Sequence, residues 1–226
     1  LWSEQGLGDS LQFSRLVNEL VSHGATVDII LQLSHVTLLN VLSTLQGVGQ
    51  VMMMDGNSVT FNRRYDYHSP MMSLMGLMSV RIDNIPARVP YLSVPENAKL
   101  AWQESKYTDV TGLKVGLVWS TLLTDSLLNE NAMHYEEKNK KSLPIAAIQQ
   151  LLTLSNVHFF VLHVSVSEAD QQWLSQYNVS IMSDKINDFG DTAAIIDHMD
   201  MVISIDTSVV HLAGAMAKPT INILPY

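Results

Sequence analysis

The stretch EQGLGDSLQFSRL, residues 4–16, places a carboxylate where a helix is expected to begin. Asp9 follows Gly8 directly, and the apolar residues after it recur at helical spacing. One interpretation is structural, because an aspartate at this point can accept a hydrogen bond from a free backbone N–H of the first turn. The other is catalytic, because a carboxylate at the mouth of a cleft can act as a general base. The residue pattern alone leaves both interpretations open.

A second stretch, SIDTSVVHLAGAMAKP at residues 204–219, gathers polar side chains at the start of another expected helix. Asp206 ends a strand, Thr207 and Ser208 open the helix, and His211 follows within about one turn. Hydroxyls, backbone N–H groups and an imidazole that converge at a helix N-terminus suit a diphosphate. The alternative is ordinary structure, since Asp, Thr and Ser are common N-cap residues and a lone helical histidine commonly packs in the core.

Strands and helices of about ten residues alternate along the chain, which predicts parallel sheets joined by crossover helices. We expect an α/β protein of two halves, residues 1–107 and 108–226, that face each other across a cleft. Small residues at Gly214 and Ala215 are expected to let the helix of the second motif pack closely on its sheet. Helices are expected near 13–23, 35–45, 96–106, 168–176, 191–199 and 208–217 and from Pro144 onward, strands near 26–31, 50–54, 114–119, 157–164, 179, 201–205 and 220–224, and short extended pieces at 65–68 and 89–92.

Composition narrows the classes of function. A net charge of -9 over 226 residues disfavours a broad surface that tracks nucleic acid, although a local pocket can still bind an anion. The chain has no cysteine, so it has no disulfide framework and no thiolate nucleophile, which is compatible with the expected cytoplasmic location. No apolar run reaches the roughly 18 to 20 residues of a membrane-spanning helix, and the histidines show no metal-ligand spacing, so neither a span nor a metal site is expected.

Three stretches together resemble a known family: the EQGLGDSLQFSRL motif, YDYHSPMMSLMGLMSVRIDNIPARVPYL, and DFGDTAAIIDHMDMVISIDTSVVHLAGAMAKPTINILPY. They are similar to the glycosyltransferase domain that follows tetratricopeptide repeats in many bacterial proteins, and this group is similar to the ADP-heptose:lipopolysaccharide heptosyltransferases of glycosyltransferase family 9. The resemblance implies a GT-B fold of two Rossmann-like domains, with an acceptor-binding first half and a second half that binds a nucleotide diphosphate sugar. It also implies inverting transfer without a metal or cofactor. The acceptor could be a glycan, a lipid-linked saccharide or a protein.

The resemblance gives individual residues a role. Asp9 matches the family's proposed general base, and the DTxxxHLAGA motif matches the region that stabilises the departing diphosphate. The residues expected to bind the donor diphosphate are Asp206, Thr207, Ser208, His211, Lys140, Lys141 and Ser120, and those expected on the acceptor side are Gly8 and His68. For His68, a structural histidine bonded to a loop carbonyl is an equal alternative.

The chain departs from the family pattern in three places. After Trp119 the short turn of the relatives is replaced by a longer polar segment that contains Lys140 and Lys141, which could also be a solvated loop. The stretch LHVSVSEAD stands where many relatives carry a glutamine and a basic residue after the strand. The chain also stops at Tyr226 where relatives continue, and we expect it to be incomplete at both ends. These departures keep two alternatives open: a non-catalytic module that binds a sugar nucleotide or a protein, and a sugar-nucleotide epimerase on the same fold.

Overall fold

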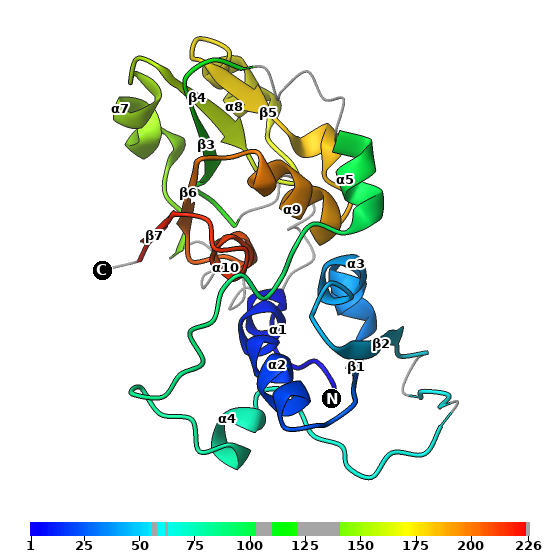
Figure 1. The fold of residues 1–226 in the computed structure, drawn as a ribbon. Coiled ribbons are helices and arrows are strands. Elements are labelled where there is room, and N and C mark those ends of the chain that lie inside the picture. The colour runs from blue at the N-terminus through cyan, green and yellow to red at the C-terminus, as the bar shows by residue number, and fades with distance from the viewer. Residues whose placement is uncertain (56–57, 62, 103–109, 122–140, 225–226) are drawn as a thin grey trace.

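The computed structural model describes residues 1–55, 58–61, 63–102, 110–121 and 141–224. Figure 1 shows a five-stranded sheet with its helices in the upper part and a two-stranded sheet with its helices in the lower part. Helices α1 (Leu7–Phe13) and α10 (Ser208–Ala215) meet between them. The protein therefore has the expected α/β architecture, with all of its named strand pairs parallel.

The larger sheet has the strand order β5-β4-β3-β6-β7. Its strands are rich in apolar and β-branched residues, as is typical of parallel strands that are covered on both faces. Each strand lies where the sequence predicts one, so the pattern of the C-terminal half is confirmed. The strands are β3 (Leu113–Val118), β4 (Val157–Val161), β5 (Val179–Ile181), β6 (Met201–Ile205) and β7 (Thr220–Ile223).

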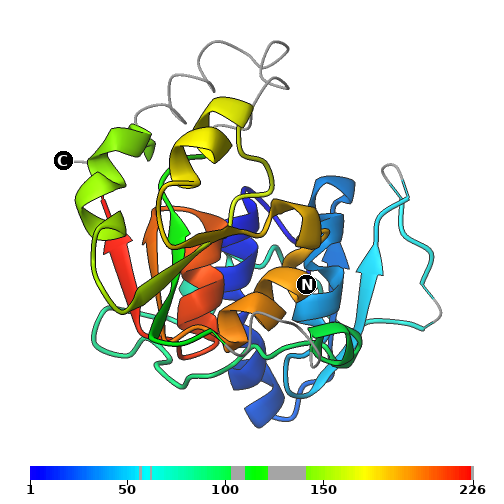
Figure 2. The same cartoon turned by 90° about the horizontal axis from the view of Figure 1, so that it is seen from above.

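Helices cover both faces of this sheet (Figure 2). Successive strand side chains point to opposite faces, so Phe159 packs in a core with Leu152 and Leu174, whereas Phe160 packs in a core with Ile195. The 3-10 helix η3 and the helices α7 and α8 supply the first core, and α9 and α10 supply the second. The bounds are η3 (Ile145–Ile148), α7 (Gln149–Leu152), α8 (Glu168–Leu174), the 3-10 helix η4 (Ser183–Lys185) and α9 (Phe189–Asp197).

The N-terminal part forms a smaller sheet than the resemblance implies. In the described residues it has two strands, β1 (Val27–Leu31) and β2 (Val48–Met53), and Trp2 adds single bridges to Ile30 and to Pro70. The extended pieces expected at 65–68 and 89–92 form no strand there. Pro90 has no backbone N–H to give to a ladder, and Tyr65 is held by its hydroxyl group instead.

Short helices cover one side of the smaller sheet. The helical stretch expected after Asp9 is divided into α1 and α2 (Arg15–Ser22), with Ser14 between them donating its hydroxyl to the Leu11 carbonyl at 2.8 Å. Gly24 ends α2 with a φ of +88°, a conformation that favours glycine. The helix expected at 35–45 is a 3-10 helix, η1 (Leu33–Leu38), followed by α3 (Leu39–Leu42), and a further short helix α4 spans Leu74–Leu77.

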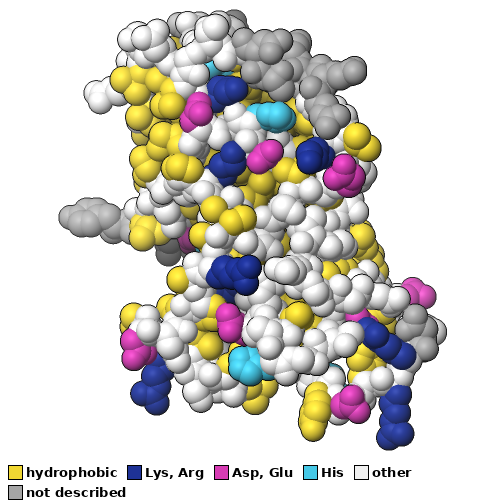
Figure 3. Space-filling view, in the orientation of Figure 1, with side chains coloured by type: hydrophobic (Ala, Val, Ile, Leu, Met, Phe, Trp, Pro, Cys, Tyr) yellow, Lys and Arg dark blue, Asp and Glu magenta, His cyan; other side chains and the backbone are white. Residues whose placement is uncertain are grey.

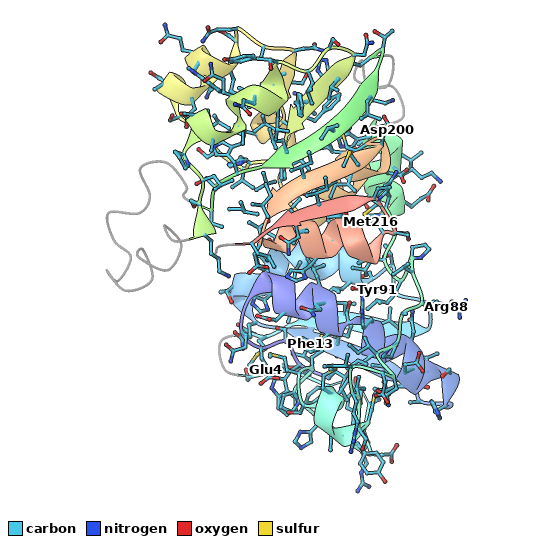
Figure 4. The ribbon with its side chains drawn as sticks, turned by 90° about the vertical axis from the view of Figure 1, so that its left-hand side faces the viewer. Glu4, Phe13, Arg88, Tyr91, Asp200 and Met216 are labelled. Atoms are coloured by element: carbon cyan, nitrogen blue, oxygen red, sulfur yellow. The ribbon has the colours of Figure 1, made fainter. Side chains whose placement is uncertain are left out.

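The segment after the smaller sheet crosses beneath α10. The backbone N–H groups of Tyr91 and Leu92 both donate to the Ala215 carbonyl, at 2.9 and 3.3 Å, and Figure 4 shows Tyr91 beneath this helix. The Tyr91 hydroxyl donates to the Leu11 carbonyl at 3.2 Å, so this residue joins α1, through its side chain, to α10, through its backbone. Helix α5 (Glu96–Trp102) then packs on α9. The predicted domain boundary at 107/108 falls outside the described residues and stays a prediction.

Two surface properties follow from the arrangement. No helix in the described ranges is long and apolar enough to cross a membrane. On the face drawn in Figure 3, Lys and Arg side chains are scattered among Asp and Glu and do not gather into one patch.

Candidate active site

The two sequence motifs meet where α1 lies against α10. A Cβ atom added to Gly8 would stand 2.8 Å from Cδ2 of His211 and 3.6 Å from Cα of Ser208. Real Cβ contacts are not that short, so only glycine allows the imidazole to lie where it does. Gly8 thus lets the N-terminal motif touch the C-terminal one, although the two are far apart in sequence.

His211 belongs to a cluster of charged groups at the start of α10. Lys141 Nζ lies 3.0 Å from Oδ2 of Asp206, and His211 Nε2 lies 3.8 Å from Oδ1 of the same carboxylate. Burial lowers the pKa of His211, and the nearby carboxylates of Asp206 and Asp9 oppose that shift because they favour the protonated ring. The structure therefore brings Asp9, Asp206, His211 and Lys141 into one electrostatic neighbourhood.

Asp9 caps its own helix. Its Oδ2 accepts a hydrogen bond from the Gly6 backbone N–H at 2.9 Å, in a capping arrangement at the start of α1. Asp9 therefore takes part in capping as expected, but its partner is the N–H of the N-cap residue Gly6 and not an N–H of the first turn. One oxygen makes this bond, so the cap leaves Oδ1 for a catalytic role, and the predicted role as a base stays a prediction.

A cavity of about 340 Å³ opens beside this cluster. Its floor is the edge of the larger sheet where β3, β4 and β6 end, and Leu7 and Thr37 close it from the N-terminal part. Ligands of open parallel sheets bind at this edge, beyond the carboxyl ends of the strands. The polar side chains that line it are Ser120, Thr121, His163, Asn187, Asp188, Thr192, Thr207 and Ser208.

The start of α10 offers N–H groups and hydroxyls to this cavity. Thr207 is the N-cap residue, and its Oγ1 accepts a hydrogen bond from the Val209 N–H at 3.3 Å. The Ser204 hydroxyl lies 3.1 Å from Thr207 Oγ1 and holds it in place. Thr207 and Ser208 both line the cavity, so an anion there would meet the positive end of the helix dipole.

Of the remaining predicted donor residues, Ser120 lines the cavity and its hydroxyl lies 3.1 Å from that of Ser142. Lys141 reaches the site through its ion pair with Asp206. Lys140 lies outside the described residues. In the part of the chain that the structure describes, no three His, Asp or Glu side chains gather as metal ligands.

His68 is not part of this cluster. Its ring lies 5.3 Å from that of Trp2, centroid to centroid, and both line a second pocket of about 320 Å³ beside Asp28. The structure therefore gives no contact between His68 and the groups around Asp9. Gly214 also differs from expectation, because a Cβ there would meet nothing within 4 Å, whereas Ala215 is buried. The prediction for Gly214 was wrong, since this glycine faces open space.

Sequence reasoning missed Arg15. Its guanidinium lies over the Tyr91 ring at 5.0 Å, its Nε is buried without a hydrogen-bond partner, and its charge contributes to lowering the pKa of His211. The arginine stands in the quoted first motif, and no sequence signal distinguished it from a surface arginine of the helix.

Two further residues of the cavity, Asp188 and His163, were not assigned to the site from the sequence. Asp188 caps α9 by accepting hydrogen bonds from the N–H groups of Gly190 and Asp191, at 2.7 and 3.0 Å. It also accepts a hydrogen bond from Asn40 Nδ2 at 2.6 Å, which ties α3 to α9. For His163, no sequence signal distinguished it from a histidine packed in the core.

Comparison with known proteins agrees with this geometry. The family described as glycosyltransferase family 9 (heptosyltransferase) matches residues 185–224, a range that holds the start of α10 and its polar residues. No curated protein matches the sequence. The sequence match is thus local and falls on the second motif.

Solved structures are similar over nearly the whole chain. A glycosyl transferase family 9 protein from Veillonella parvula DSM 2008 has a TM-score of 0.65 and 12% identity, over 99% of this chain and 80% of that one. The ADP-heptose lps heptosyltransferase II of E. coli has a TM-score of 0.62 and 14% identity, over 98% and 82%. The E. coli heptosyltransferase WaaC, solved with ADP and with ADP-2-deoxy-2-fluoro heptose, has a TM-score of 0.56 in the ADP form and 12% identity, over 98% and 86%.

These similarities define the class of fold. The chain has the heptosyltransferase-like GT-B fold of family 9 glycosyltransferases, with one main five-stranded sheet and a reduced N-terminal sheet in the described residues. At identities of 10–14% the likeness concerns the fold, and activity has to be argued from the site.

Proposed function

We propose that the protein is an inverting, metal-independent glycosyltransferase that moves a sugar from a nucleotide diphosphate sugar to an acceptor hydroxyl. The contact between Gly8 and His211 carries this proposal, because it places the carboxylate of Asp9 beside a polar helix start at the mouth of a cavity. An inverting transfer needs these two elements together: a base for the acceptor and positive groups for the leaving diphosphate.

The reaction follows from their positions. Asp9 takes the proton of the acceptor hydroxyl as its oxygen attacks the anomeric carbon, on the face opposite the diphosphate. The new carbon–oxygen bond forms while the bond from the anomeric carbon to the phosphate oxygen breaks, and the electron pair leaves with the nucleoside diphosphate. His211, Lys141 and the N–H groups of the first turn of α10 stabilise the negative charge that develops there.

Asp206 has a positioning role in this scheme. A carboxylate would repel a diphosphate, but this one holds Lys141 at 3.0 Å and faces the imidazole of His211. It thereby fixes the direction of the Lys141 ammonium group and opposes part of the lowering of the His211 pKa that burial causes. Because Lys141, His211 and the helix N-terminus can stabilise the diphosphate without a metal ion, we expect a chelator to leave the rate of transfer unchanged.

The donor is tested first as an adenosine diphosphate sugar, because WaaC was solved with ADP and with an ADP-heptose analogue. The acceptor belongs to one of three classes: a glycan, a lipid-linked saccharide or a protein. A cytoplasmic location and an attached array of tetratricopeptide repeats belong to the same proposal, and both rest on the family resemblance.

The first experiment is calorimetric titration of ADP, UDP and GDP, and of their common sugar conjugates, into the wild type and into His211→Ala. We expect one nucleotide to bind saturably, and to bind at least about ten times more weakly to the variant, since the hydrogen bond from the imidazole to the diphosphate is lost. Transfer to each acceptor class is then assayed by mass spectrometry with the nucleotide that binds. Binding that is unaffected in His211→Ala would remove the second motif from the donor site.

A further inference from the structure

His163 lies at the carboxyl end of β4 with its ring in a wall of the cavity. It is 8% exposed, and its ring packs on that of Trp119, with 4.0 Å between the ring centroids. The backbone N–H of Trp119 donates a hydrogen bond to His163 Nε2 at 3.1 Å. Neighbouring strands β3 and β4 are thus joined at their ends by this side chain.

That hydrogen bond fixes the tautomer of the ring. Since Nε2 accepts, it carries no proton, and a neutral imidazole must then carry its proton on Nδ1. Burial lowers the pKa of His163 to about 4, so the ring is neutral at physiological pH. The ring therefore presents an N–H donor at Nδ1 and does so without a charge.

The donor at Nδ1 has no partner in the part of the chain that the structure describes, and it is not fully buried. Among the described residues, the one hydrogen bond of the His163 side chain is that with Trp119. Two fully buried polar side-chain atoms of the described residues lack a hydrogen-bond partner, Arg15 Nε and Asn18 Oδ1. Nδ1 of His163 is not one of them, so it is not fully buried. The small exposed area of His163 therefore includes Nδ1, and the residue lines the cavity at the ends of β3, β4 and β6.

The distance from α10 suits a nucleoside. In the strand order, β4 stands two positions from β6, which leads into α10, and β3 lies between them. With neighbouring strands about 4.8 Å apart, the ends of β4 and β6 are separated by about 10 Å. A diphosphate at the start of α10 would place its ribose near the end of β3, beside Ser120, and its base near His163. Apolar side chains at Leu162, Ile186 and Phe189 line the same cavity and suit the faces of a base.

We propose that His163 reads the base of the donor nucleotide, by donating a hydrogen bond from Nδ1 to a carbonyl oxygen or an unprotonated ring nitrogen on the base edge. This rests on the proposed function, since it takes the diphosphate to lie at α10. It makes His163 a determinant of which nucleotide is bound, with no part in the chemical step. A base edge that presents only donors at this point is rejected, because two N–H groups would then face each other without an acceptor.

The test compares wild type, His163→Gln and His163→Leu in calorimetric titrations with ADP, UDP, GDP and inorganic pyrophosphate. Glutamine can accept from the Trp119 N–H and still donate to the cavity, so we expect its affinity for the preferred nucleotide to stay within about threefold of wild type. Leucine can do neither, and we expect a loss of about tenfold. Pyrophosphate lacks a base, so its affinity should be the same in all three proteins.

A spectroscopic measurement separates recognition from a purely structural role. In wild type, the proton resonance of His163 Nδ1–H is expected to shift when the preferred nucleotide saturates the site, and to stay in place with pyrophosphate. Wild-type affinity of His163→Leu for the nucleotide, or an unmoved resonance, would overturn the inference and leave the proposed function standing. If wild type binds neither a nucleotide nor pyrophosphate, the proposed function fails and the inference fails with it.

Discussion

Gly8 and His211 are in contact across the boundary between the two parts of the molecule, with 2.8 Å between a Cβ built at the glycine and Cδ2 of the imidazole. The glycine belongs to the motif that carries Asp9, and the histidine to the motif that begins α10. Because the missing side chain makes room for the ring, the two motifs lie side by side. A glycine is needed before Asp9 because any larger side chain at position 8 would collide with His211. This is a more direct explanation than the position of Gly8 near the start of a helix.

Gly8→Ala is expected to weaken nucleotide binding about tenfold with little change in the free energy of unfolding. The new methyl group must displace the imidazole, while alanine gains up to about 1 kcal/mol over glycine within a helix. Gly214→Ala is the matched control in α10, since a Cβ there meets nothing within 4 Å. Urea denaturation and calorimetry measure both effects. If Gly8→Ala binds the nucleotide as tightly as Gly214→Ala does, the position of the His211 ring has no effect on nucleotide affinity.

Asp9→Asn is expected to lower the turnover rate at least about 100-fold with an unchanged donor affinity, because the base is lost. Asparagine retains an oxygen for the 2.9 Å bond from the Gly6 N–H, so we expect the melting temperature to equal that of the wild type. Asp9→Ala loses that bond as well and should cost about 1 kcal/mol of stability. Steady-state kinetics and thermal melts provide the readouts. A full transfer rate in Asp9→Asn would assign the residue to capping alone.

Lys141→Met is expected to weaken diphosphate binding about tenfold and to reduce its dependence on salt. The change removes a cation and leaves the Asp206 carboxylate, now without the partner at 3.0 Å, to repel the ligand. Lys99→Met on α5 makes the same change of charge away from the cavity. Titrations at two ionic strengths compare the two. A similar loss in both variants would point to net charge rather than to a specific contact.

Asp188→Ala is expected to cost about 2 kcal/mol of stability, and Asn40→Ala about 1 kcal/mol. The aspartate caps α9 at two N–H groups and also accepts the 2.6 Å bond from Asn40, whereas the asparagine variant loses only that last bond. A double-mutant cycle in urea isolates the Asn40–Asp188 coupling. Ser167→Ala, which removes the cap of α8, provides a comparison outside this contact. Strict additivity would mean that the bond adds nothing to stability.

Acidification should destabilise the protein partly through His163. Its folded pKa of about 4 lies below the unfolded value of 6.5, so the unfolded chain binds the proton more tightly. Stability is then complete above pH 6.5 and falls as the pH drops towards 4. Between pH 7 and pH 5 the loss amounts to about 2 kcal/mol. Urea denaturation of wild type and His163→Gln at both pH values isolates this contribution. Equal pH dependence in the two proteins would contradict it.

The sequence predicted the local elements well. Strands β3 to β7 and helices α8 to α10 fall in or near the expected ranges, because residues a few positions apart carry their periodicity. The N-terminal half was predicted less well: β-like composition at 65–68 and 89–92 does not become a strand in the described residues, since pairing depends on a partner edge elsewhere.

For the site, the sequence by itself determined which groups are present: a carboxylate at one helix start, hydroxyls and an imidazole at another, and a lysine before the last helices. Only the tertiary structure decided that Gly8 meets His211, that His68 lies in a different pocket, and that Gly214 faces open space. It also decided that Arg15 lies over the Tyr91 ring and that His163 lines the cavity. Periodicity is set by near neighbours in the chain, whereas the distance between side chains far apart in sequence is set by how helices and sheets pack.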